Sequence, residues 1–209
     1  MSALRENLSA RRVRLPGTTG CGHMTTGYSP LLPRYISQLE RASGEAPVLD
    51  LACGSGRNGL YLIDRDIPVV FADRDPAALA AVEQAILDSG LDDSERLVTL
   101  WPVDLEAPAG EPLAGQQYAG ILVFRYLHRP LFEAIKQAVC PGGVVIYETF
   151  TVDQAQFGRP KNPDYLLRHG ELAAIFSGWQ VLHSFEGVVE SIGAGDPRAI
   201  AQIVAIKDP

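Results

Sequence analysis

Apolar residues follow two patterns between residues 28 and 207, and the two patterns alternate along the chain. Stretches with an apolar residue every three or four positions predict amphipathic helices, whereas short, almost wholly apolar runs predict buried strands. The expected helices cover residues 30–42, 58–65, a segment that begins at 75, 130–139 and 171–176. The expected strands cover residues 46–52, 67–72, 96–103, 118–124, 144–149, 180–185 and 201–207. Strands separated by helices are typical of βαβ units, so we expect one doubly wound α/β domain with helices on both faces of a mostly parallel sheet.

The helix that begins at residue 75 has the clearest start signal. Asp75 is followed directly by Pro76, which is the usual order of a capping carboxylate and a proline at the first helical position. Leu79, Val82 and Ile86 then recur at spacings of three and four, so we expect them to be buried on one face.

The composition narrows the classes of protein to which the chain can belong. Its 209 residues are 46% hydrophobic, which suffices for the core of one domain. A formal net charge of −7 disfavours a nucleic-acid partner, because such proteins need a basic face. No apolar run approaches the ~20 residues that span a bilayer, so no membrane partner is expected. Three cysteines far apart in the chain argue against a disulfide framework and favour a reducing, cytoplasmic setting.

The first residues differ in character from the rest of the chain. Residues 1–23 contain four arginines and one acidic residue and have no apolar segment of the kind found in secretory signals. We therefore expect residues 1–23 to be a disordered extension and residues 24–209 to form the folded domain.

A glycine-rich turn joins the first expected strand to the next helix. The run from Asp50 to Gly59 reads DLACGSGRNG, in which Gly54, Gly56 and Gly59 match the spacing of a dinucleotide-binding fingerprint. Glycines are needed where the backbone turns tightly and approaches a ligand without an intervening Cβ. An NAD(P)-dependent oxidoreductase is therefore one hypothesis for this chain.

Asp50 favours a different ligand, because a carboxylate four residues before Gly54 would repel a pyrophosphate. S-adenosyl-L-methionine (SAM) has an ammonium and a sulfonium group and no phosphate. Asp50 could serve its aminoacyl end, Asp73 at the end of the second strand its ribose hydroxyls, and Asp104 after the third strand its adenine amino group. The carboxyl ends of successive parallel strands line the crevice in which such sheets bind ligands.

The motifs VLDLACGSG, FADRD, VDL and Pro-Gly-Gly together resemble those of class I SAM-dependent methyltransferases. Ala52 stands where a first glycine is usual in that family. The resemblance covers residues 28–207 and implies a Rossmann-like domain with a seven-stranded sheet whose last strand is antiparallel. It also implies contacts with SAM from a set of residues around the glycine turn and the strand ends: Asp50, Ala52, Cys53, Gly54, Gly56, Arg57, Asn58, Asp73, Arg74, Asp104, Leu105, Phe124 and Arg125.

Several segments in the second half of the chain show a narrower resemblance, to the tellurite-resistance branch and more distantly to thiopurine S-methyltransferases. They are RYLHR at residues 125–129, YETF at 147–150 and the stretch from 157 to 172. This resemblance implies that Arg125, His128 and Arg168 position a small-molecule acceptor, such as a thiol or a chalcogen oxyanion. Arg129, Arg159, Lys161 and His169 fall in the same segments.

Each of these residues also has a structural interpretation. Asp50 and Asp104 are equally able to bind backbone N–H groups, and Arg57 could be a solvated side chain. Cys53 is expected to be a small filler. Glu171 could cap a helix or pair with Arg168.

The sequence leads to a methyltransferase hypothesis with two alternatives. Methyl transfer would proceed by direct displacement, and a soft acceptor would need no general base, whereas a hydroxyl or amine acceptor would make His128 or His169 candidate bases. The alternatives are a non-catalytic SAM-binding regulator and the oxidoreductase. We expect no metal site, since Cys21 and His23 alone cannot supply four zinc ligands. The oligomeric state stays open.

Overall fold

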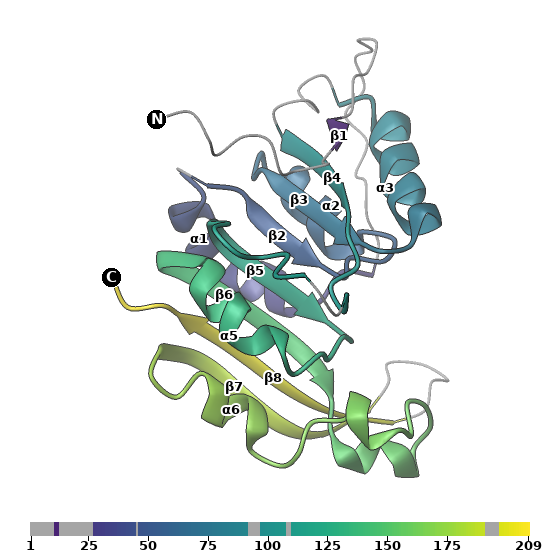
Figure 1. Ribbon diagram of the computed structural model, residues 1–209, viewed down its shortest axis with the longest axis vertical. Helices are drawn as coiled ribbons and strands as arrows, with labels where there is room; N and C mark the ends of the chain where they lie inside the picture. The colour runs from purple at the N-terminus through teal and green to yellow at the C-terminus, as the bar shows by residue number, and fades with distance from the viewer. Residues whose placement is uncertain (1–10, 13–26, 45, 92–96, 108–109, 191–196) are drawn as a thin grey trace. The chain divides into compact units, whose positions relative to one another are not determined.

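The computed structural model describes residues 11–12, 27–44, 46–91, 97–107, 110–190 and 197–209 (Figure 1). The chain divides into two compact units, Met1–Pro112 and Leu113–Pro209. Apart from Arg11–Arg12, the predicted extension at residues 1–23 lies outside the described residues, so its order stays a prediction. Strands and helices largely alternate among the described residues up to β7 (Gln180–Val189), and β8 (Arg198–Ile206) follows β7 directly in the order of elements, as the hydrophobic pattern predicts.

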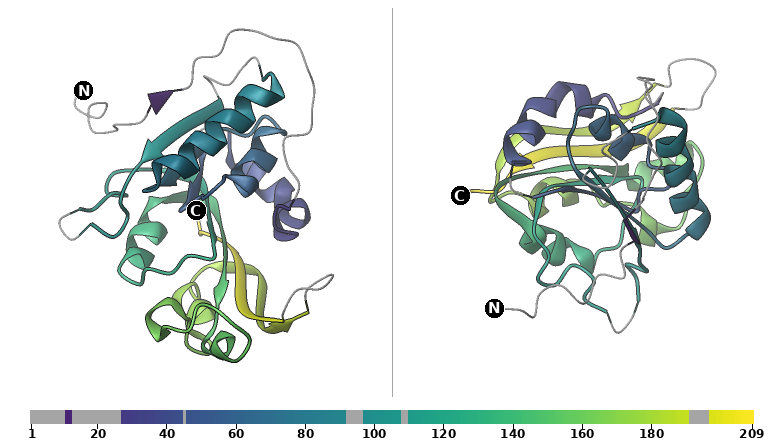
Figure 2. Two further views of the ribbon diagram at one scale, coloured as in Figure 1. Left: turned by 90° about the vertical axis from the view of Figure 1, so that its right-hand side faces the viewer. Right: turned by 90° about the horizontal axis from the view of Figure 1, so that it is seen from above.

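The first unit is built on a parallel sheet, whose strands lie in the order β1-β4-β3-β2. Strands β2, β3 and β4 are parallel, whereas the short β1 pairs with β4 in the antiparallel direction. Figure 1 shows α3 beside β3 and β4, and the left view of Figure 2 shows it lengthwise. The elements are β1 (Arg11–Arg12), α1 (Leu31–Ala42), β2 (Val48–Leu51), α2 (Arg57–Ile63), β3 (Val69–Asp73), α3 (Pro76–Ser89) and β4 (Val98–Pro102).

The parallel strands of this unit end level with one another. Leu51 pairs with Ala72, and Asp73 pairs with Pro102. Beyond the strands, the N–H of Cys53 still bonds to the carbonyl of Ala72 at 3.0 Å. The glycine turn and the acidic residues that follow β3 and β4 therefore meet at one edge of the sheet.

The helix starts follow from the local sequence. Asp75 caps α3, since its side chain accepts a hydrogen bond from the N–H of Ala77 at 2.9 Å and Pro76 occupies the first turn. Leu79, Val82 and Ile86 are the buried residues of this helix, which confirms the predicted stripe. In α1 the apolar residues Leu31, Leu32, Tyr35 and Leu39 are buried, whereas Ile36 is only half-buried.

The second unit contains the strand order β5-β6-β8-β7. Strands β5 and β6 are parallel, and β8 is antiparallel to both β6 and β7, which confirms the predicted reversal of the last strand. Figure 1 shows β6, β8 and β7 side by side, with α6 next to them. The elements are β5 (Tyr118–Phe124), α5 (Leu131–Ala138), β6 (Val139–Phe150), the 3₁₀ turns η1 (Val152–Gln156) and η2 (Pro163–Tyr165), α6 (Glu171–Ile175), β7 (Gln180–Val189) and β8 (Arg198–Ile206).

Strand β6 is longer than the sequence predicts. The hydrophobic run predicts a strand at residues 144–149, with Pro141-Gly142-Gly143 as a turn before it, but pairing with β5 already begins at Val139. The register with β5 shifts between Tyr118 and Gly120, so the Pro-Gly-Gly segment is an irregularity inside the strand. A Cβ at Gly143 would lie 2.8 Å from the carbonyl oxygen of Ala119, so glycine permits this close pairing.

Both units have largely aliphatic cores. In the second unit Phe132 of α5 packs against Tyr147 of β6 with ring centroids 5.7 Å apart.

Among the helices of the described residues, none is long and apolar enough to cross a membrane.

Candidate functional site

The glycine turn of the first unit has an unusual backbone. Ala52, Gly54 and Gly56 have φ values of +53°, +54° and +71°, in the left-handed region. Gly56 is the N-cap of α2, and its carbonyl accepts the N–H of Leu60 at 2.8 Å. Ala52, which stands where the resembled family usually has a first glycine, thus adopts a left-handed conformation that costs about 1–2 kcal/mol for a residue with a Cβ.

Two of the glycines are required by close packing, Gly56 against α3 and Gly59 against β3. A Cβ at Gly56 would lie 2.5 Å from Cγ2 of Val82, and one at Gly59 would lie 2.3 Å from Cε1 of Phe71. The first turn of α2 therefore lies directly on the Phe71 ring. In this chain the third glycine of the fingerprint serves close contact between helix and strand.

Asp50 faces the glycine-rich segment and is 2% exposed. Its Oδ2 accepts a hydrogen bond from the N–H of Gly59 at 2.9 Å. Burial raises the pKa of Asp50 to about 7, against the opposing effects of that hydrogen bond and of the Arg57 charge. Asp50 thus joins β2 to α2, as its structural interpretation expects, and it keeps a titratable group beside the turn.

Asp73 holds the other side of the turn. Its Oδ2 accepts the N–H of Gly54 at 2.8 Å, and its Oδ1 accepts the N–H of Asp75 at 2.9 Å. The predicted ribose-binding carboxylate therefore lies next to the glycine turn. Asp75, two positions further along, is engaged as the helix cap, as the sequence predicts.

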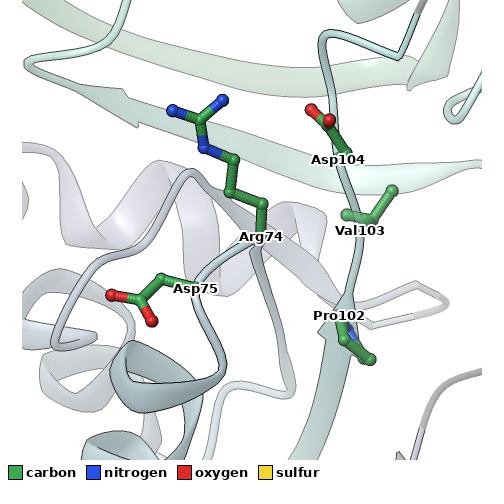
Figure 3. A pocket seen from close by; sticks show the side chains of 5 residues that line it. All are labelled: Arg74, Asp75, Pro102, Val103 and Asp104. Atoms are coloured by element: carbon green, nitrogen blue, oxygen red, sulfur yellow. The ribbon is translucent and has the colours of Figure 1, made fainter.

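A cavity of about 710 Å³ opens where β3 and β4 end, and it is lined by Arg74, Asp75, Pro102, Val103 and Asp104. In Figure 3 the Asp104 carboxylate is turned toward the side on which Arg74 extends its guanidinium, whereas Asp75 points away. The structure therefore brings the predicted residues Arg74 and Asp104 together around one space.

Two polar contacts involve residues that line this cavity. Oδ1 of Asp104 accepts the N–H of Glu106 at 3.0 Å, which is the backbone contact that its structural interpretation expects. The carboxylate of Glu106 lies 3.9 Å from Nη1 of Arg74. Leu105, which lies between Asp104 and Glu106 in the sequence, is buried.

Arg57 and Asn58 have contacts that the sequence did not predict. Nη1 of Arg57 donates to the carbonyl of Gly27, and Oδ1 of the buried Asn58 accepts the N–H of Ser29 at 2.9 Å. Tyr28, between these two, packs on Tyr61 of α2 with ring centroids 4.1 Å apart. Both predicted cofactor-binding residues thus attach the segment before α1 to the start of α2. No sequence signal indicates partners about 30 positions away.

The thiol of Cys53 is poorly suited to nucleophilic chemistry. Burial, with the charges of Asp50 and Asp73, raises its pKa far above the ordinary range. A thiol that stays protonated at neutral pH is a weak nucleophile, which agrees with the interpretation of Cys53 as a filler.

In the second unit, the predicted residues after β5 stand on a short loop. Phe124 is buried at the end of the strand, and the exposed Arg125 follows with φ of +58°. The N–H of Arg125 bonds to the carbonyl of Glu148 on β6 at 2.8 Å, so the loop starts from a fixed point. His128 lies three residues further along and is half-buried.

Arg129, which falls in the same segment as Arg125 and His128, forms an ion pair within the second unit. Its guanidinium forms a two-point contact with the carboxylate of Glu171, at 2.7 Å and 2.9 Å. The prediction that Glu171 could pair with the side chain of Arg168 is therefore wrong about the partner. Glu171 instead accepts the backbone N–H of Arg168 at 2.8 Å, and the Arg168 side chain is exposed.

His169 is also bound by carboxylates. Its Nδ1 lies 2.8 Å from Glu186, and its Nε2 lies 3.7 Å from Asp153. The hydrogen bond with Glu186, together with the charge of Asp153, raises the pKa of His169. A histidine that holds its proton more tightly is a weaker candidate base at neutral pH. The described residues contain no group of three or more His, Cys, Asp or Glu that could hold a metal ion.

Comparison with known proteins identifies the fold. No family model matches the chain, and no curated protein matches its sequence. Among solved structures, TehB from Haemophilus influenzae superposes with a TM-score of 0.62 at 20% identity, over 82% of this chain and 62% of TehB. The chain thus spans less than two thirds of the length of TehB.

Two further structures match over most of both chains. A SAM-dependent methyltransferase from Methanosarcina mazei gives a TM-score of 0.60 at 14% identity, over 88% of this chain and 99% of the other. The glycopeptide N-methyltransferase MtfA, in complex with SAM, gives 0.54 at 17% identity, over 83% and 87%. These likenesses show the Rossmann-like α/β fold that the sequence predicts.

Proposed function

We propose that this chain is a SAM-dependent methyltransferase that acts on a small, soft and anionic acceptor. The observation that carries the proposal is the hydrogen bond from the N–H of Gly59 to the buried carboxylate of Asp50, which puts an acidic group beside the glycine turn near the end of β2. A dinucleotide would bring a pyrophosphate to such a turn. A carboxylate beside the turn suits a cationic, phosphate-free nucleoside better.

The donor set of the first unit fits SAM. Asp50 and Asp73 would face its ammonium and its ribose hydroxyls, and Asp104 would accept from its adenine amino group across the cavity shared with Arg74. The cavity volume of about 710 Å³ lies within the range of small-molecule sites. The fold likeness to MtfA, which was solved with SAM, supports this assignment.

Once bound, SAM supplies an activated methyl group, so the protein has to orient the acceptor and exclude water. Orientation of this kind can lower a barrier by about 7–11 kcal/mol. Arg125, His128 and Arg168 are the candidates for acceptor binding, and the positive charges of the two arginines suit a thiolate or a chalcogen oxyanion. A soft acceptor of this type needs no base, which agrees with the carboxylate-bound state of His169.

Ligand-dependent melting temperatures test the cofactor assignment. We expect S-adenosylhomocysteine to raise the melting temperature in a dose-dependent way, whereas NAD and NADP leave it unchanged. As a control, Asp208→Asn changes an exposed residue beyond the end of β8. This variant should show the same ligand-dependent rise in melting temperature as the wild type. Stabilisation by NAD or NADP instead would contradict the proposal and favour an oxidoreductase.

The acceptor is tested with methyl-labelled SAM and a panel of thiols, selenite and tellurite. Transfer of label to at least one of them is the expected result. Binding of S-adenosylhomocysteine without transfer to any acceptor of the panel would favour the non-catalytic SAM-binding regulator.

A further inference from the structure

Arg129 joins three parts of the second unit. Its Nε and Nη2 donate to the two carboxylate oxygens of Glu171, at the start of α6, at 2.7 Å and 2.9 Å. Its Nη1 donates to the carbonyl of Asp164 at 3.0 Å, and Nη2 also donates to the carbonyl of Leu166 at 2.8 Å. The guanidinium of Arg129, on the loop after β5, thus contacts η2, the following Leu166 and the start of α6.

The contacts of Glu171 extend this arrangement to Arg168. The oxygen Oε2, which receives Nη2 of Arg129, also accepts the backbone N–H of Arg168 at 2.8 Å. The neighbouring Leu167 is paired with Thr151 at the end of β6. The backbone from which the Arg168 side chain emerges is therefore fixed from both sides.

The same contacts bear on His128, which directly precedes Arg129. The carbonyl of Arg129 accepts the N–H of Phe132 at 3.1 Å, and that of His128 accepts the N–H of Leu131 at 3.0 Å. Arg129 is therefore held at the start of α5 by its backbone and at α6 by its side chain. A shift of either segment would alter the spacing between His128 and Arg168.

We infer that Arg129 and Glu171 are a positioning pair that sets the distance between His128 and Arg168 for acceptor binding. This inference rests on the proposed function, because it assigns the pair to the acceptor side of that reaction. Neither residue of the pair touches the acceptor; the pair acts through the two segments that it joins.

The chemistry of the pair requires arginine. A guanidinium offers two parallel N–H groups to a carboxylate and further N–H groups to carbonyls, whereas the ammonium of lysine is a compact charge on a flexible stem. The side chains of Arg129 and Glu171 are 31% and 18% exposed, so solvent only partly screens their contact. Their hydrogen bond also lowers the pKa of Glu171, which keeps it ionised.

The decisive variants are Arg129→Lys, which keeps the charge, and Glu171→Gln, which keeps the shape. The exposed ion pair between Lys136 and Glu133 on α5, at 3.1 Å, supplies the matched control, Glu133→Gln. All proteins are assayed with S-adenosylhomocysteine for cofactor affinity and with SAM plus selenite or 2-mercaptoethanesulfonate for transfer. Hydrogen exchange of the Arg168 amide reports the loss of its bond to Glu171.

We expect both variants to bind S-adenosylhomocysteine like the wild type and to raise the acceptor KM about tenfold or more, with kcat changed less. Exchange at Arg168 should accelerate in both, and Glu133→Gln should change neither quantity. Lower melting temperatures with an unchanged acceptor KM would overturn the inference and leave a purely structural ion pair. A wild type that fails to bind S-adenosylhomocysteine would instead refute the proposed function. If the wild type binds S-adenosylhomocysteine but methylates neither acceptor, the inference is also overturned, because it assumes that the chain methylates such an acceptor.

Discussion

Oδ2 of Asp50 and the backbone N–H of Gly59 are joined by a hydrogen bond of 2.9 Å across nine positions of the chain. The N–H groups in the first turn of a helix have no partner within the helix, and Asp50 supplies one for α2. A carboxylate at this place also interacts favourably with the positive end of the helix dipole. The same side chain is buried, and that burial penalises its charge.

These opposing effects predict how stability depends on pH. Burial raises the pKa of Asp50 from 3.8 to about 7, so between these pH values the folded state binds more protons than the unfolded state. The free energy of unfolding should therefore fall as pH rises through this window. Urea denaturation across the window should show a shallower fall for Asp50→Asn than for the wild type. Equal slopes for the two proteins would show that Asp50 is already ionised throughout.

Ala52→Gly should stabilise the protein. Ala52 has φ of +53°, where a Cβ is strained, and glycine removes that strain at the cost of a more flexible unfolded chain. We expect a gain of about 0.5–1 kcal/mol in the free energy of unfolding. Ala80→Gly, at an exposed site inside α3, is the matched control and should lose about 0.5–1 kcal/mol. A loss at both positions would mean that Ala52 is not strained.

Substitutions of Asp73 and of Asp75 should differ in their effect on cofactor binding. Asp73→Asn should weaken S-adenosylhomocysteine binding by about 1–3 kcal/mol, as for a hydrogen bond to a charged group. Asp75→Ala should lower stability by about 1 kcal/mol through loss of the α3 cap, with little effect on affinity. Calorimetric titration and thermal denaturation of both variants distinguish the two roles. The ribose assignment fails if Asp73→Asn binds the ligand as tightly as the wild type.

Gly59→Ala should destabilise the protein by about 1–3 kcal/mol, because the added methyl group overpacks the contact between α2 and β3. The clash is with the Phe71 ring, at 2.3 Å, and with Oδ2 of Asp50, at 2.9 Å. Phe71→Leu should therefore be less harmful in the Gly59→Ala background than in the wild type, which a double-mutant cycle measures. Strict additivity would argue against the contact.

Local sequence patterns predict the helices and most of the strands, because helix caps and buried stripes depend on residues only a few positions apart. The cap at Asp75 and the buried residues Leu79, Val82 and Ile86 follow from spacing alone, and β5 has the predicted bounds. The start of β6 at Val139 was not predictable, since its pairing partner Tyr118 supplies the order across a proline and two glycines.

The candidate site shows the same limit. The sequence places Asp50 beside the glycine turn because the two are neighbours in the chain. It places Asp73 there, 19 positions from Gly54, because parallel strands end at one edge of the sheet. It cannot reveal that Arg129 takes Glu171, because those partners are 42 positions apart and several cations compete for one carboxylate. Nor can it show that Asn58 receives the N–H of Ser29, 29 positions earlier.

The arginines of the second unit differ in how firmly their side chains are held, and this difference can be used in protein engineering. Arg129 is immobilised by a carboxylate and two carbonyls, whereas Arg159 and Arg168 extend their side chains into solvent. Exposed side chains tolerate replacement at little thermodynamic cost. Libraries that vary residues 159, 161 and 168 while retaining Arg129 would therefore diversify molecular recognition on a scaffold that still folds.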